Sequence, residues 1–297
     1  MKRNLITLCL MVMASAVMAQ GKYGSMGKRT YKNNQDVNVA IEKVKAQIME
    51  IQDAGALAKS LAKKIATNTV KKQFKQMAEN QYAFGFPDGE YTEYAYFDTD
   101  NNRSVGFIPK LGRVVINDWK NGQVTIAFPN LKLALSYSFN PEAMRQQGQS
   151  DIADMFTSKP LLDGQEVEEI DGFMGAENVA YHKDKPLADG ETAEKEIVVD
   201  GKRYEAILLP GHMLMKNEKE FYYGIYIDGE TNTPYLSMSV QMLEFKPCEV
   251  DEANFQLPED YKVVKDVKSL NKLLLKEVKQ NKHVMQDPGE LPAIFWP

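Results

Sequence analysis

The stretch that decides the fold class runs Leu131-Lys132-Leu133-Ala134-Leu135-Ser136-Tyr137-Ser138-Phe139. Large apolar residues alternate in it with small or polar ones. A period of two places successive side chains on opposite faces of a β-strand, so one face is expected to be buried and the other wet. The apolar face consists of Leu131, Leu133, Leu135, Tyr137 and Phe139.

Turn signals on both sides of this strand predict hairpins. Asn121-Gly122 lies between Trp119 and Val124, and Asp200-Gly201 separates two further apolar runs. Such dipeptides favour the tight turns that join antiparallel strands. Alternating runs also occur over 221–227 and 236–242, with a turn beginning at Asp228. Hairpin after hairpin indicates an antiparallel sheet rather than βαβ winding.

Helical spacing appears before and after the sheet. Asp36 is a plausible N-cap for a first stripe, a second stripe follows it, and a third lies near the C-terminus. The three stripes are Ile41, Val44, Ile48 and Ile51; Leu57, Leu61, Ile65, Phe74 and Met77; and Val264, Val267, Leu270, Leu274 and Val278. The first two are narrow and surrounded by lysines, so these helices need an apolar surface to lie on.

The sequence thus predicts an α+β fold with N-terminal helices, an antiparallel sheet, a C-terminal helix and an apolar tail. The expected segments are a signal peptide (1–19), a flexible lead (20–35), a helical segment (36–86), an antiparallel β domain (87–262), and a C-terminal helix with the tail (263–297).

The first nineteen residues are typical of a secretory signal. A basic start (Lys2, Arg3) precedes an apolar run, and Val17 and Ala19 are small residues suited to cleavage before Gln20. The alternative is a buried N-terminal helix. Cys9 lies inside the apolar run, so it is not placed to carry a lipid. We therefore expect an exported protein of the bacterial envelope that is either periplasmic or secreted. We do not expect an integral membrane protein.

Charge and cysteine content restrict the partners and the chemistry. Of 36 basic residues Lys2 and Arg3 leave with the signal, whereas all 41 acidic residues stay, so the net charge moves from −5 to −7. This balance argues against nucleic acid, and against an anionic membrane as a main target. The remaining Cys248 cannot form an internal disulfide; it is expected to be a small buried hydrophobe, with a nucleophile as the alternative.

No motif predicts a catalytic site, a metal site or a bound cofactor. His182, His212 and His283 lack metal-ligand spacing. The acidic run that begins at Asp98 resembles the start of a calcium loop, but Arg103 stands where that loop needs glycine, so a turn between strands explains it better. The carboxylates Glu168, Glu169 and Asp171 leave open a hydrolase with no recognisable motif.

The apolar chain end, Ile294-Phe295-Trp296, should not lie in water. Three alternatives remain open for it. It docks on the protein's own core, it fills a ligand groove of the protein, or it is a hook for a partner.

A short pattern closes the predicted sheet: Val250-Asp251, then Phe255-x-Leu257-Pro258-x-x-Tyr261. It resembles the end of exported lipoprotein-sorting proteins of the LolA/LolB type and of related envelope families. The resemblance implies a curved, half-closed antiparallel sheet with an apolar groove for lipid or another hydrophobic ligand. The candidates for the groove or for partner contact are Leu131, Leu133, Leu135, Tyr137, Phe139, Phe295 and Trp296.

Three functions follow as hypotheses. The first is an exported non-enzymatic envelope protein that binds lipid or another hydrophobic ligand. The second is a structural or protein-interaction module that uses the helices (36–80) or the tail (291–297), with another envelope protein as a possible partner. The third is the hydrolase.

Overall fold

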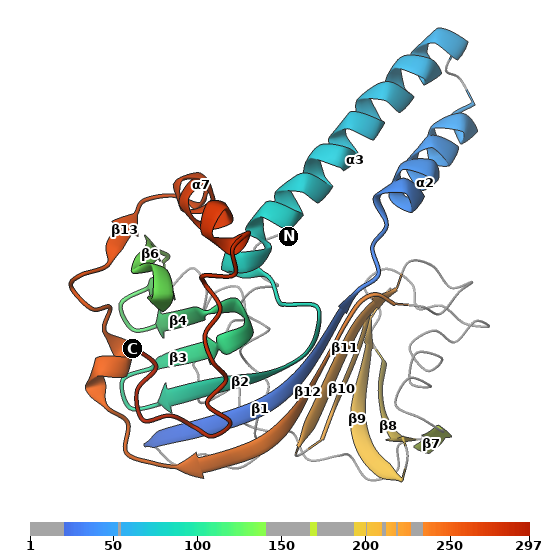
Figure 1. Cartoon of the computed structure of the whole chain (residues 1–297). Coiled ribbons are helices and arrows are strands. Elements are labelled where there is room, and N and C mark those ends of the chain that lie inside the picture. The colour runs from blue at the N-terminus through green and yellow to red at the C-terminus, as the bar shows by residue number, and fades with distance from the viewer. Residues whose placement is uncertain are drawn as a thin grey trace.

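The computed structural model describes residues 21–52, 55–140, 167–170, 193–199, 201–209, 212–217, 219–226 and 234–297 (Figure 1). The expected signal peptide, the turn at Asp228, and both Asp171 and His182 lie outside these ranges.

The described strands form one open sheet of thirteen strands in the order β13-β6-β5-β4-β3-β2-β1-β12-β11-β10-β9-β8-β7. Neighbours are antiparallel except at the two edges, where β13 pairs with β6 and β7 pairs with β8 in parallel. The expected α+β fold is confirmed, and the sheet curves strongly from β1 towards β7 (Figure 1).

The strand bounds are β1 Lys22–Asn33, β2 Gly89–Asp98, β3 Arg103–Ile108, β4 Arg113–Asp118, β5 Gln123–Phe128, β6 Leu133–Ser138, β7 Val167–Ile170, β8 Ala193–Val199, β9 Lys202–Leu209, β10 His212–Lys216, β11 Glu220–Tyr226, β12 Pro234–Pro247 and β13 Lys262–Val264.

Strand β1 corrects the expectation of a flexible lead over 20–35. It is the seventh of the thirteen strands and pairs with β12 on one side and β2 on the other, so it joins the two halves of the sheet. Its glycines suggested a linker, but at least one of them is needed for packing. A Cβ on Gly24 would come within 2.3 Å of the Leu291 side chain, which lies over this part of the strand.

The hairpins at Asn121-Gly122 and at Gly201 are confirmed, since β4 pairs with β5 and β8 with β9. Two other connections share a pattern that was not predicted from the sequence. The 3-10 turns η1 (Pro109–Leu111) and η2 (Pro129–Leu131) each begin at proline and end in a left-handed residue. Those residues are Gly112 and Lys132, with φ of 53° and 46°.

Within the described ranges three α-helices accompany the sheet: α2 (Val37–Glu50), α3 (Ala56–Phe84) and α7 (Val267–Val278). The first two lie in sequence between β1 and β2, which are hydrogen-bonded neighbours, so the helical hairpin is an insertion at one end of the sheet. It projects away from the sheet, and α3 reaches furthest (Figure 1). We call α2 and α3 the helical arm.

The C-terminal part of the chain covers both faces of the β2–β6 region. Helix α7 buries Leu270, Leu274 and Val278 in one apolar cluster with Phe128 of β5 and Leu133 of β6. The chain then passes the ends of the hairpins, where Met285 N donates to Pro109 O and Asn130 Nδ2 to Val284 O. It continues across the other face, in front of β2 and β3 (Figure 1).

This arrangement corrects the expectation that the strand around Leu133 lines an open groove. Leu133 and Leu135 are buried in the cluster beneath α7 and belong to the core. Leu131 is in η2 and packs against the same cluster. Tyr137 is 38% exposed, and Phe139 lies beyond the strand, edge-on to Trp119. Leu133 and Leu135 are core residues because α7 supplies its own apolar stripe to this face.

Candidate functional site

The helical arm is held firmly where it joins the sheet. The Arg113 guanidinium, on β4, donates to the carbonyl oxygens of Tyr82 and Gly85 over 3.0 and 2.8 Å. These carbonyls end α3 and have no partner within the helix, so the arginine caps it. Asn271 of α7 adds a hydrogen bond to Asn80 of α3 at 2.8 Å.

A buried ion pair supports the same junction from β1 and β2. Arg29 is 2% exposed, and its guanidinium lies 2.6 Å from the Glu93 carboxylate, which it engages through two nitrogens. The guanidinium also lies 4.8 Å from the ring centre of Phe86, which follows α3. A bidentate pair with a stacked ring fixes orientation well, because Arg presents a planar array of donors. The base of the arm is therefore rigidly placed.

The two helices of the arm pack on each other through only part of their surface. On α2 the inward residues are Ile41, Val44 and Ile48, of which Ile41 is buried, in agreement with the first predicted stripe. The half-buried small and apolar positions of α3 recur every four residues: Ala62, Ala66, Val70 and Phe74. These residues share one partly covered face of α3, and α3 contacts α2.

The second predicted stripe is not one face of α3: Phe74 is on the half-buried face, whereas its first three residues lie elsewhere. These three, Leu57, Leu61 and Ile65, are 86%, 59% and 58% exposed. At about 100° per residue they lie on the side of α3 opposite its half-buried face. These side chains were expected to lie on an apolar surface, yet no described residue covers them. Met49 and Ile51, at the distal end of α2, are also more than half exposed.

The charge of the arm differs in sign from that of the chain. Helix α3 contains six lysines and one glutamate, whereas the chain has a net charge of −5. Lys59 donates to the Met49 carbonyl at 3.0 Å and joins the distal ends of the two helices. The arm thus combines exposed apolar residues with a basic surface.

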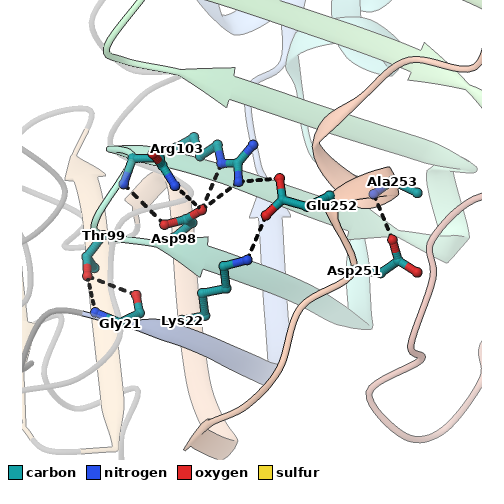
Figure 2. A network of polar contacts seen from close by, with 9 residues as sticks. Gly21, Lys22, Asp98, Thr99, Arg103, Asp251, Glu252 and Ala253 are labelled. Carbon is teal, nitrogen blue, oxygen red and sulfur yellow. Dashed lines mark hydrogen bonds and ion pairs between the residues drawn. The ribbon is translucent and has the colours of Figure 1, made fainter.

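A polar network lies at the ends of β1 and β2 that are far from the arm. It connects β1 to the C-terminal segment (Figure 2). Asp98, fully buried at the end of β2, accepts from Arg103 and Asn101. Arg103 also pairs with Glu252 at 2.6 Å, and Glu252 pairs with Lys22 at 2.7 Å. Asp98, the first carboxylate of the acidic turn, is therefore paired with an arginine of the same chain.

The pKa of Asp98 shows which interaction prevails in this network. Burial alone would raise the pKa of this carboxyl, but the hydrogen bonds from Asn101 and Arg103 outweigh burial and hold it below the ordinary value. The charged form is therefore favoured. The network has the character of a structural clamp between Lys22 and Glu252, not of a catalytic acid.

The apolar tail packs on the protein's own core. Phe295 is 2% exposed and stacks on Tyr96 at 5.1 Å between ring centres. Its backbone N–H donates to Asn254, a buried side chain that also donates to Ala293 O. Trp296 donates its indole N–H to Ala253 O at 2.8 Å and meets Tyr261 edge-on. Of the three alternatives for the tail, the first describes this packing.

The residues of the resemblance pattern serve this docking. Val250 and Phe255 are buried in the cluster that receives Phe295. Asp251 caps the short η4 helix (Glu252–Phe255), and the Arg103 guanidinium lies 4.2 Å from the ring centre of Phe255. Tyr261 is buried beside Trp296. The pattern therefore marks where the chain turns back onto the sheet.

The other chemical candidates do not converge among the described residues. No group of three or more His, Cys, Asp or Glu side chains in these ranges could hold a metal ion. Burial raises the pKa of Cys248, which favours the neutral thiol over the nucleophilic thiolate. Glu168 and Glu169 are on the edge strand β7. Among the helices of the described ranges, none has both the length and the apolar character that crossing a membrane requires.

Comparisons with known proteins leave the function open. No family model matches the chain, and no curated protein matches it. Among solved structures, an uncharacterized conserved protein from Thermus thermophilus matches with a TM-score of 0.36 and 8% sequence identity, over 83% of this chain and 91% of that one.

Proposed function

We propose that the chain is an exported, non-enzymatic protein of the bacterial cell envelope whose helical arm docks on a partner. In this proposal the sheet is the platform and the arm is the working part. The signal-like N-terminus supports export. The observation that carries the docking role is the uncovered stripe of Leu57, Leu61 and Ile65 on a helix whose base is fixed.

The exposed apolar row is energetically unfavourable in water, and a partner that covered it would remove this cost. Three exposed branched side chains in one row cost free energy in water, at about 25 cal/mol per Å² of apolar surface. Scattered exposed apolar residues are ordinary, but a contiguous row on a projecting element is typical of an interaction surface. The fixed base lowers the cost of binding, because little orientational freedom remains to be lost there.

The test compares binding to a bacterial envelope fraction. Leu57→Gln, Leu61→Gln and Ile65→Gln are combined in one variant, since glutamine keeps helix propensity while removing the apolar surface. The matched control combines Val39→Gln and Met77→Gln, which replace exposed apolar residues of the arm away from the stripe. We expect the stripe variant to lose binding and the control to retain it; equal retention by both would refute the docking role.

A second candidate is the binding of a lipid or another hydrophobic ligand on the curved part of the sheet. The curvature of β8–β12 in Figure 1 favours it. Mass spectrometry of gently purified protein tests this candidate. A co-purifying lipid at a fixed ratio is expected, and protein that neither carries nor takes up acyl chains would exclude it.

A further inference from the structure

We infer that the partner of the arm is an anionic lipid surface, on which the outer face of α3 lies with its distal apolar residues inserted and its lysines on the headgroups. This inference rests on the proposed docking role and names its target.

The outer face of α3 carries both parts that such a surface requires. Leu57, Leu61 and Ile65 form the distal part of the face. Lys64, Lys72 and Lys75 lie within roughly 60° of Leu61 around the helix, at 3.6 residues per turn. Apolar residues and lysines on one face suit an interfacial helix, in which the apolar part is buried about 5–10 Å deep and lysines reach the headgroups.

Exposed apolar residues lie near the distal end of the arm on both helices. Met49 in the last turn of α2 and Ile51, the residue that follows this helix, are 55% and 51% exposed, and Leu57 at the start of α3 is 86% exposed. The core of a protein–protein interface is packed as densely as a protein interior, so a protein partner needs a surface of matching shape. Exposed apolar residues around the distal end of the arm are better suited to a fluid lipid phase, since lipid can bury each of them without a matching cavity.

The lysines also argue against a second copy packed in parallel as the partner. Two outer faces of α3 packed in parallel would place Lys64, Lys72 and Lys75 of each copy close to the same residues of the other. Like charges in close contact are destabilising, so parallel pairing of this face is unfavourable. The carboxylate on this face, Glu79, is paired with Lys75 at 3.8 Å. Glu50, at the distal end of α2, is exposed and can remain in water.

The net negative charge of the whole chain predicts repulsion from an anionic surface. Binding depends, however, on the charge of the part of the chain that touches the surface. The chain's net charge is −5 because, outside the arm, acidic residues outnumber basic ones by more than the positive charge of the arm. The 29 residues of α3 span about 44 Å at 1.5 Å per residue. Exposed charges more than about 10 Å apart are largely screened at 0.1 M salt. A surface that meets the arm therefore responds to α3 and not to the distant sheet.

The test is flotation of the full chain with vesicles at 0.1 M salt. One set contains equal parts of phosphatidylglycerol and phosphatidylcholine, and the other contains phosphatidylcholine alone. We expect binding to the anionic set, weaker by about ten-fold or more on the neutral set, because each lysine near the surface contributes favourably. Raising the salt to 0.5 M should weaken the anionic binding by a similar factor.

Two variants and two controls locate the contact. The stripe variant should lose binding to anionic vesicles, and Lys64→Gln, Lys72→Gln and Lys75→Gln together should lower it by about ten-fold. The controls are Val39→Gln with Met77→Gln, and Lys268→Gln, Lys272→Gln and Lys276→Gln on α7, all exposed lysines. Both controls should bind as the unaltered protein does. Circular dichroism confirms that every variant is folded.

The outcomes separate this inference from the docking role. If anionic vesicles do not bind the chain, or bind the stripe variant equally well, the lipid inference is wrong. If envelope binding then still depends on the stripe and is abolished by protease treatment of the envelopes, a protein partner replaces lipid and the docking role stands. A dimer in sedimentation that the stripe variant loses would identify a second copy and also overturn the lipid inference.

Discussion

Asp98 shows how one buried carboxyl is kept charged at the scale of a residue. Its side chain is fully buried, and the Arg103 guanidinium lies 2.7 Å away. Asn101 donates from both its backbone and its side chain. If the charge of Asp98 were removed, the half-buried Arg103 would keep only the exposed Glu252 as an ion-pair partner. Most of the free energy at this site is therefore carried by Asp98 rather than by Glu252.

The first prediction follows from this imbalance. Asp98→Asn should lower the free energy of unfolding by about 2–4 kcal/mol at pH 7, because it breaks a buried pair from one side. Glu252→Gln should cost less than about 1 kcal/mol, because its pairs are exposed. Chemical denaturation of the two variants measures both values. A larger loss for Glu252→Gln would contradict the assignment.

The same carboxyl sets a pH dependence whose sign can be worked out. The folded pKa of Asp98 is below its ordinary value of 3.8, so its contribution to stability is complete above that pH. The contribution is lost as the pH falls through the folded pKa, because the proton then binds the folded state too. We expect the gap in stability between the unaltered protein and Asp98→Asn to be constant from pH 5 to 7 and to shrink below about pH 4. A gap that widened on acidification would contradict this sign.

Gly112 provides a second residue-scale test. A Cβ there would lie 1.5 Å from the His283 carbonyl oxygen, which belongs to the backbone and cannot rotate away. Gly201 also has a positive φ, but nothing lies within 4 Å of a Cβ built on it. Gly201→Ala therefore measures the cost of the backbone conformation alone, about 1 kcal/mol. Gly112→Ala should cost about 2 kcal/mol more, since the whole C-terminal segment must shift. Equal costs in denaturation would show that His283 is free to move.

At the scale of elements, the tail behaves as part of the core. Phe295 fills a space between Tyr96 and Phe107, and Asn254 holds the backbone on both sides of it. Phe295→Ala should lower the free energy of unfolding by about 3–5 kcal/mol, as for other buried aromatic residues. Ile294→Ala is the matched control, because Ile294 is 43% exposed and should cost far less. A tail that served only as a hook would tolerate both changes.

The elements also show which sequence signals were sufficient. Alternation and turn dipeptides predicted the hairpins because each depends on neighbours in sequence. The place of β1 was missed, since its partners lie on β2 and β12 and its Gly-rich composition is equally typical of a linker. For α3 the helix was predicted but not its buried face: the larger residues Leu57, Leu61 and Ile65 suggested the wrong side, whereas Ala62 and Ala66 permit the close approach of α2.

The molecule as a whole consists of a sheet held together by many hydrogen bonds and packing contacts, and an arm attached at one end of it. β1 has hydrogen-bonded neighbours on both sides, and the C-terminal segment packs across it at Gly24. The arm is tied at its base by Arg113 and Arg29, whereas along α2 and α3 only Ile41 and Ala83 are buried. Local opening is cheapest where buried contacts are fewest.

Hydrogen exchange should therefore reveal two levels of protection. Amides of β1 and β2 are expected to exchange only on global unfolding, whereas amides of the distal arm, over 44–50 and 57–66, should exchange faster by at least about a hundred-fold. Phe86→Ala, which removes the ring beside Arg29, should loosen the base of the arm and raise exchange near Tyr82 while β1 stays protected. Equal protection of the sheet and the distal arm would mean that the two open as one unit. The arm would then be stabilised by contacts other than those at its base, and the platform-and-arm division would fail.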